Sequence, residues 1–327
     1  MGNLLVTGGT GQIGTELIPF LRARFGNERV VATGHRKKPS EEILAAGPFA
    51  VLDVRDAGAL AELVARYEID TIYHLAGVLS AVGEANPQLA WEVNMNGLYN
   101  VLEVARSHGC AVFFPSSIAA FGPGSPLDNT PQVTIQRPRT IYGIAKVAGE
   151  LLCDYYHRHY GVDARGVRYP GLISHQALPG GGTTDYAVEI FYAALRGEPY
   201  RCPLAADTAL DMMFMEDALR AAVELMTAEP SRLKHRNAYN LTAMSFTPAI
   251  LAEAIRRHIP EFVMEYAVDP VRQAIAESWP NQMDDRAARA EWGWQPAYDL
   301  EATVTTMLAR LAEKLGSLAL REEKRWG

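Results

Sequence analysis

A run of glycines near the amino end constrains the fold more than any other feature of the sequence. Gly8, Gly11 and Gly14 follow an apolar segment, residues 3–7, that has the pattern of a short buried strand. They open a stretch that predicts a helix from about Ile13 to the Gly26-Asn27 break. Glycines at such a turn leave no side chain in the way of a pyrophosphate, and the first amides of the helix face the anion. The segment therefore predicts a dinucleotide-binding unit.

Predicted strands and helices alternate through the first half of the chain. The apolar runs predict strands at 29–33, 49–52, 71–75, 111–115 and 164–169, and they predict helices at 57–67, 88–108 and 140–160. Strands separated by helices of this length form parallel βαβ units. The fold class expected is α/β, a Rossmann doubly wound parallel sheet.

The pattern loosens after residue 170. We expect a dinucleotide-binding Rossmann domain at 1–170 and a smaller, mainly helical substrate-binding domain at 171–320, with helices at 185–196, 217–227, 247–258 and 300–315. The strand-like residues 238–241 suggest that segments near 205–245 return to the Rossmann domain.

Composition excludes several classes of function. The 327 residues are 48% hydrophobic and carry a formal charge of −7, so the chain can fill a large core and has no broad basic field for nucleic acid. Cys110, Cys153 and Cys202 are too widely spaced for a metal knuckle, and no metal site is predicted. No apolar run reaches the ~18 to 20 residues of a membrane span, and Met1 leads directly into a strand. The cytoplasm is the expected location, with no membrane partner.

Tyr142 and Lys146 are four residues apart on a predicted helix and share one face. An ammonium at that distance lowers the pKa of a phenol from its usual value of ~10, which makes the phenol a usable proton acceptor. Ser116 and Ser117 follow the strand at 111–115 and are expected at the carboxyl edge of the sheet, where ligands bind. A general base and a hydroxyl at this edge indicate a dehydrogenase.

The Gly-x-x-Gly-x-x-Gly spacing with Tyr-x-x-x-Lys resembles the extended short-chain dehydrogenase/reductase superfamily. The resemblance implies that Ser117, Tyr142 and Lys146 are catalytic, with Lys146 also on the nicotinamide ribose. Asp53 would contact adenine or simply end a strand, and Arg168 would flank the nicotinamide or form a structural ion pair. The residues expected to bind the cofactor are Gly8, Gly11, Gln12, Ile13, Gly14, Arg36, Asp53, Val54, Leu75, Ala76, Asn94, Tyr142, Lys146 and Tyr169.

The choice of cofactor depends on the end of the second strand. An acidic residue there accepts the adenosine ribose hydroxyls of NAD, whereas an Arg favours the 2′-phosphate of NADP. The chain has Gly34 followed by His35, Arg36 and Lys37. Taken alone, these residues favour NADP, unless the basic loop is merely solvated.

Several longer stretches resemble the short-chain type of L-threonine 3-dehydrogenase over nearly the whole chain. They are Pro115-Ser-Ser-Ile-Ala-Ala-Phe-Gly122, Arg137-Pro-Arg-Thr-Ile-Tyr-Gly-Ile-Ala-Lys146, Pro170-Gly-Leu-Ile-Ser174, Pro179-Gly-Gly-Gly-Thr-Thr-Asp-Tyr-Ala187, Ser278-Trp-Pro280 and Trp292-Gly-Trp294. The resemblance implies oxidation of the β-hydroxyl of L-threonine to 2-amino-3-ketobutyrate. That family uses NAD and typically has Asp where this chain has Gly34. The resemblance also makes a homodimer possible for this chain. The substrate-binding residues that the resemblance implies are Ser80, Ser116, Thr183, Thr184 and Trp279.

Two other functions stay open. A nucleotide-sugar epimerase or dehydratase would share the first 170 residues and would retain NAD between turnovers, but its resemblance does not extend to the Gly-Gly-Gly-Thr-Thr-Asp-Tyr-Ala stretch. A non-catalytic dinucleotide sensor would keep the Rossmann domain but would have no need of an acidified Tyr142. The three consecutive glycines at 180–182 also suggest a loop that closes over the substrate.

Overall fold

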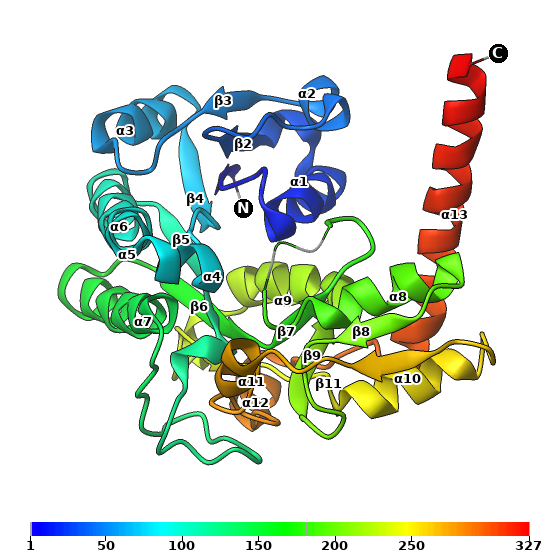
Figure 1. The fold of residues 1–327 in the computed structure, drawn as a ribbon. Helices are drawn as coiled ribbons and strands as arrows, with labels where there is room; N and C mark the ends of the chain where they lie inside the picture. The colour runs from blue at the N-terminus through cyan, green and yellow to red at the C-terminus, as the bar shows by residue number, and fades with distance from the viewer. Residues whose placement is uncertain (1, 179, 181, 327) are drawn as a thin grey trace.

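The computed structural model describes residues 2–178, 180 and 182–326, and its centre is a parallel sheet of seven strands (Figure 1). The spatial order is β10-β6-β5-β4-β1-β2-β3, with every neighbouring pair parallel. The strands are β1 (Asn3–Thr7), β2 (Val30–Gly34), β3 (Phe49–Val51), β4 (Ile69–His74), β5 (Ala111–Ser117), β6 (Ala164–Tyr169) and β10 (Tyr239–Asn240). The predicted Rossmann α/β fold is confirmed.

Helices cover both faces of this sheet because its strands are apolar on both sides. Along β1, Leu4 and Val6 belong to one buried cluster and Leu5 to another, since successive side chains point to opposite faces. The first cluster includes residues of α1 (Gln12–Phe25) and α9 (Met215–Thr227), and the second includes residues of α3 (Ala57–Arg66), α6 (Gly97–His108) and α7 (Ile141–Tyr160). A short helix, α2 (Glu41–Ala46), lies between β2 and β3.

The single helix predicted at 88–108 is wrong in one respect. The structure has α5 (Pro87–Trp91), a π-helical turn at Glu92–Asn96, and then α6. Within this turn, Asn94 accepts a hydrogen bond from Val78 N at 2.7 Å and donates one to Val78 O at 3.0 Å. Periodicity could not reveal this turn because a π-turn adds one residue without interrupting the helical run.

The second half of the chain forms a separate apolar core around two small sheets. One sheet has the order β11-β9-β7 and the other pairs β12 with β8. The elements here are β7 (Gly171–Ile173), α8 (Tyr186–Arg196), β8 (Tyr200–Cys202), β9 (Leu210–Phe214), β11 (Met244–Phe246), α10 (Pro248–Arg256), β12 (Met264–Tyr266), α11 (Pro270–Ala276) and α13 (Leu300–Trp326). Helix α12 (Arg286–Trp292) instead packs Ala288 and Trp292 into the cluster of the large sheet. Most of these strands have only three residues, too few to show an alternating pattern.

The chain returns to the large sheet through α9 and β10, where Tyr239 and Asn240 pair with Val167 and Arg168 of β6. The division of the chain near residue 170 stays a prediction. Helix α13 is longer than the predicted 300–315, and Figure 1 shows its last turns (red) running clear of the other elements. No helix in the part of the chain that the structure describes has the length and apolar character needed to cross a membrane.

Candidate active site

Ser117, Tyr142 and Lys146 lie together where β5 ends and α7 begins. Ser117 is the last residue of β5, and Thr140 caps α7 by accepting a hydrogen bond from Gly143 N at 3.0 Å. The cap starts the helix directly before Tyr142, whose side chain is hydrogen-bonded to that of Ser117. One helical turn later, Lys146 Nζ lies 5.3 Å from the centre of the Tyr142 ring. The structure thus brings the three predicted catalytic residues together.

The pKa of Tyr142 differs from the expectation. Desolvation of the phenol raises its pKa to about 12, and the hydrogen bond with Ser117 offsets only part of this rise. The expected lowering by Lys146 is therefore wrong for this structure, because the burial that brings the two side chains together disfavours the phenolate more strongly. Burial also lowers the pKa of Lys146 to about 8, and its ammonium donates to the carbonyl oxygen of Pro115 at 2.6 Å.

The glycine turn has the shape needed for a dinucleotide. Gly8 has φ +68°, and a Cβ on it would lie 2.5 Å from Ala76 N. A Cβ on Gly14 would lie 2.6 Å from Gly8 O, so side chains are excluded where α1 meets the turn. Gly11 precedes α1 without a side-chain cap, and the first turn of α1 has no acidic residue. These residues fit the phosphates of a dinucleotide at the helix start.

Other predicted cofactor residues lie around this turn. Gln12 and Ile13 are the first two residues of α1. Leu75 and Ala76 follow β4, where Leu75 N donates to Thr7 O at 3.1 Å. Arg36 is exposed beyond the end of β2.

The side chains of two predicted cofactor residues lie in the packed core. Val54 is 4% exposed, and its Cγ2 lies 2.7 Å from the position that a Cβ on Gly97 would take. Tyr169, also 4% exposed, donates its hydroxyl to Ala218 O at 2.6 Å and pairs in register with Ser117. Both side chains support the sheet, and their contact with the cofactor stays a prediction.

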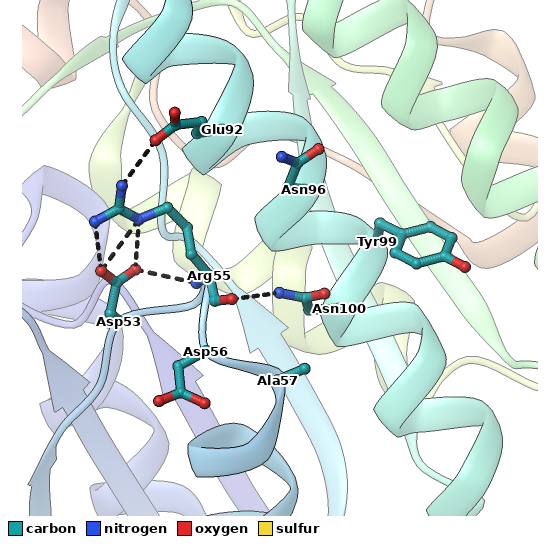
Figure 2. A pocket seen from close by; sticks show the side chains of 8 residues that line it. All are labelled: Asp53, Arg55, Asp56, Ala57, Glu92, Asn96, Tyr99 and Asn100. Atoms are coloured by element: carbon teal, nitrogen blue, oxygen red, sulfur yellow. Dashed lines mark hydrogen bonds and ion pairs between the residues drawn. The ribbon is translucent and has the colours of Figure 1, made fainter.

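Asp53 lies beside a surface hollow of about 810 Å³ (Figure 2). Its carboxylate accepts hydrogen bonds from Arg55 Nε at 3.0 Å and Arg55 Nη2 at 2.7 Å, and these bonds hold the pKa of Asp53 at about 2. The same guanidinium donates to Glu92 at 2.8 Å, as Figure 2 shows. The residues that line the hollow are Asp53, Arg55, Asp56, Ala57, Glu92, Asn96, Tyr99 and Asn100.

Four of the five predicted substrate residues lie in the segments that frame the site. Ser80 begins α4 (Ser80–Ala85), and Thr183 and Thr184 precede α8, with Thr183 buried and Thr184 half-buried. Trp279 is 7% exposed in the apolar cluster against which Tyr142 packs. Pro179 and Gly181 of the glycine-rich stretch lie outside the described residues.

The fifth residue, Ser116, points toward Glu150 of α7. Ser116 is 2% exposed, and its hydroxyl donates a hydrogen bond to the carboxylate of Glu150. Neighbouring residues of a strand point to opposite faces, so Ser116 cannot accompany Ser117 into the site.

A buried ion pair lies behind the catalytic helix. Glu150 accepts hydrogen bonds from Arg168 Nε at 3.0 Å and Arg168 Nη2 at 2.8 Å. Arg168, for which the sequence left two roles open, is therefore an ion-pair partner. Glu150 is not among the residues predicted from the sequence, although its position four residues after Lys146 on one helix was a usable signal.

Comparison with known proteins places these features in a family. Residues 4–242 match the model of the family described as NAD dependent epimerase/dehydratase family. An uncharacterised epimerase/dehydratase of Staphylococcus saprophyticus is 53% identical over 314 residues, which are 96% of this chain and 98% of the relative.

Two solved structures are similar over nearly their whole length. The structure of L-threonine dehydrogenase from Clostridium difficile has a TM-score of 0.94 and 52% identity, covering 96% of this chain and 98% of that one. The holo form of a GalE-like L-threonine dehydrogenase from Cupriavidus necator has a TM-score of 0.92 and 51% identity, covering 94% and 99%.

Proposed function

The chain belongs to the NAD dependent epimerase/dehydratase family, and from this premise we propose that it oxidises L-threonine to 2-amino-3-ketobutyrate with NAD. The observation that carries the proposal is the grouping of Ser117, Tyr142 and Lys146 at the carboxyl edge of the sheet, two strands from the Gly8 turn. The similarity to two solved L-threonine dehydrogenases supports threonine as the substrate.

The reaction needs a proton acceptor and a hydride acceptor. Tyr142 takes the proton of the β-hydroxyl while the hydrogen on the β-carbon leaves with two electrons, and the carbon–oxygen bond becomes a carbonyl. A nicotinamide dinucleotide supplies the hydride acceptor. Ser117 donates a hydrogen bond to the reacting oxygen. Lys146 lies beside Tyr142, where an ammonium would stabilise negative charge on the phenol oxygen during the proton transfer.

The remaining residues hold the amino acid. Ser80, Thr183 and Thr184 supply hydroxyls for the carboxylate and amine of threonine, and Trp279 forms an apolar wall. The support for this assignment is the position of Thr184 beside Gly171, where its methyl group lies 2.7 Å from the position that a Cβ on Gly171 would take. Gly171 follows the end of β6 at Tyr169, so Thr184 lies beside the point where the chain leaves the large sheet.

The test measures absorbance of reduced nicotinamide when the purified protein is mixed with L-threonine and NAD. We expect NADH to accumulate in proportion to the threonine consumed, and D-threonine to serve as the control substrate. A nucleotide-sugar epimerase would retain its cofactor and accumulate no NADH. Absence of NADH with NAD and of NADPH with NADP, in protein shown to bind either cofactor, would reject the proposal.

A further inference from the structure

We infer that this chain accepts NADP as well as NAD, because a glycine occupies the position of the ribose-binding carboxylate and a basic segment follows it. The inference rests on the proposed function and concerns the adenosine end of the same cofactor. Gly34 is the last residue of β2, the position from which an acidic side chain would contact the ribose hydroxyls and repel a 2′-phosphate.

A side chain at Gly34 would crowd two neighbouring side chains. A Cβ there would lie 2.8 Å from Thr10 Cγ2 and 3.3 Å from the Phe49 ring. Thr10 belongs to the glycine turn, and Phe49 begins β3. Gly34 therefore offers the ribose no carboxylate, and a larger residue there would need these two side chains to shift.

The next carboxylate along the sheet edge, that of Asp53, is already paired with a cation. Asp53 is bound by Arg55 through two of the guanidinium nitrogens, and His35 Nε2 lies 3.6 Å from Oδ2, the oxygen that also accepts from Arg55 Nη2. The pKa of Asp53 is held at about 2 by Arg55, so the carboxylate stays ionised and paired. A phosphate near the end of β2 would therefore meet no unpaired carboxylate from Asp53.

Three cations follow Gly34 within four residues. Arg36, Lys37 and Lys38 are all exposed, and among the described residues their side chains have no hydrogen-bond or ion-pair partner. Arg36 is two residues from the strand end, and two extended residues span only ~7 Å. A guanidinium binds phosphate through paired N–H donors, which makes Arg36 the residue that would contact the 2′-phosphate.

The experiment measures dissociation constants for NADH and NADPH by nicotinamide fluorescence, without threonine. The wild type should bind both, with constants within about tenfold of each other. Arg36→Gln should weaken NADPH about 10- to 100-fold and leave NADH within about twofold. Arg158→Gln removes the same charge from an exposed site at the end of α7 and should change neither constant.

Gly34→Asp and Gly34→Ala form a second pair. Asp should weaken NADPH more than NADH, whereas Ala adds the steric conflict without the charge and should affect both alike. Binding of NADH alone, or equal loss of both cofactors in Arg36→Gln, would overturn this inference and leave the proposed function intact. Binding of neither would overturn both.

Discussion

Tyr142 shows how burial changes the chemistry of a residue. A phenol with a pKa near 12 is protonated at neutral pH, so only a small fraction of the molecules carries Tyr142 as the phenolate. The amount of phenolate therefore depends on the charges and hydrogen-bond donors around Tyr142, and not only on its spacing from Lys146.

Tyr142→Phe keeps the ring and removes the proton acceptor. General-base catalysis contributes ~10²- to 10⁴-fold, so kcat for L-threonine should fall by about that factor. The dissociation constant for the dinucleotide should stay within about twofold of wild type, since the phosphates are held at the glycine turn. Turnover within a few-fold of wild type would remove Tyr142 from the mechanism.

Thr184 tests the assignment of the substrate. A hydroxyl bonded to a charged carboxylate contributes roughly 1.5–3 kcal/mol, so Thr184→Val, which keeps the shape, should lower kcat/KM for L-threonine about 10- to 100-fold. Thr184→Ser keeps the oxygen and should retain most activity. Asp185, not Thr184, occupies the N-cap position of α8, so a loss of helix capping is not expected in either variant.

If Thr184→Ser loses as much activity as Thr184→Val, the methyl packing against Gly171 is the contribution of this residue, and the threonine assignment is weakened. Melting temperatures of both variants, measured beside the kinetic constants, separate the two effects.

At the scale of elements, α1 and α13 jointly hold the turn that follows β7. Ser174 donates its hydroxyl to Glu16 of α1 and accepts from Gln176 N at 3.0 Å. From the other side, Lys314 of α13 donates to the carbonyl oxygens of His175 at 3.2 Å and Gln176 at 3.0 Å. This turn immediately precedes the glycine-rich stretch, so both helices fix where that stretch starts.

Glu16→Gln should change how stability depends on pH. Burial raises the pKa of Glu16 to about 7, so the folded protein retains this proton up to about pH 7 while the unfolded chain loses it near ~4.3. Wild-type stability therefore falls as pH rises through this window, and the amide, which cannot ionise, avoids that loss.

The variant should be more stable than wild type by roughly 1–3 kcal/mol at pH 8.5 and should differ less at pH 5.5. Urea unfolding at both pH values measures this difference. The exposed Glu62→Gln is the control for removal of a charge. An identical pH dependence in wild type and Glu16→Gln would show that Glu16 is not protonated in the native state.

At the scale of the whole molecule, the dinucleotide should act as a stabilising ligand. The proposed site uses the start of α1 and the ends of β1 and β4, two neighbouring strands near the centre of the parallel sheet. A ligand that binds only the native state at 100 times its dissociation constant adds ~2.7 kcal/mol of stability. The melting temperature should rise by several degrees with NAD in the absence of threonine.

Thermal unfolding monitored by circular dichroism checks this rise. The Thr184 variants should show the same shift, because they change no residue of the glycine turn. A melting temperature that is independent of both NAD and NADP would argue against a dinucleotide site.

The sequence by itself determined the large sheet and the grouping of the three proposed catalytic residues. Gly8, Gly11 and Gly14 define a strand-to-helix turn by local geometry, and Tyr142 and Lys146 meet because they are one helical turn apart. Ser117 could be placed beside them because the carboxyl ends of parallel strands share one edge. These inferences need only short-range spacing and a general rule of topology.

Only the tertiary structure decided what depends on distant parts of the chain. Ser116 donates to Glu150, Tyr169 donates to Ala218, and β10 joins β6 across about 70 residues. The raised pKa of Tyr142 likewise comes from the residues that bury it, including the cluster that contains Trp279. Burial and hydrogen-bond partners are properties of packed elements, so no local spacing in the sequence could specify them.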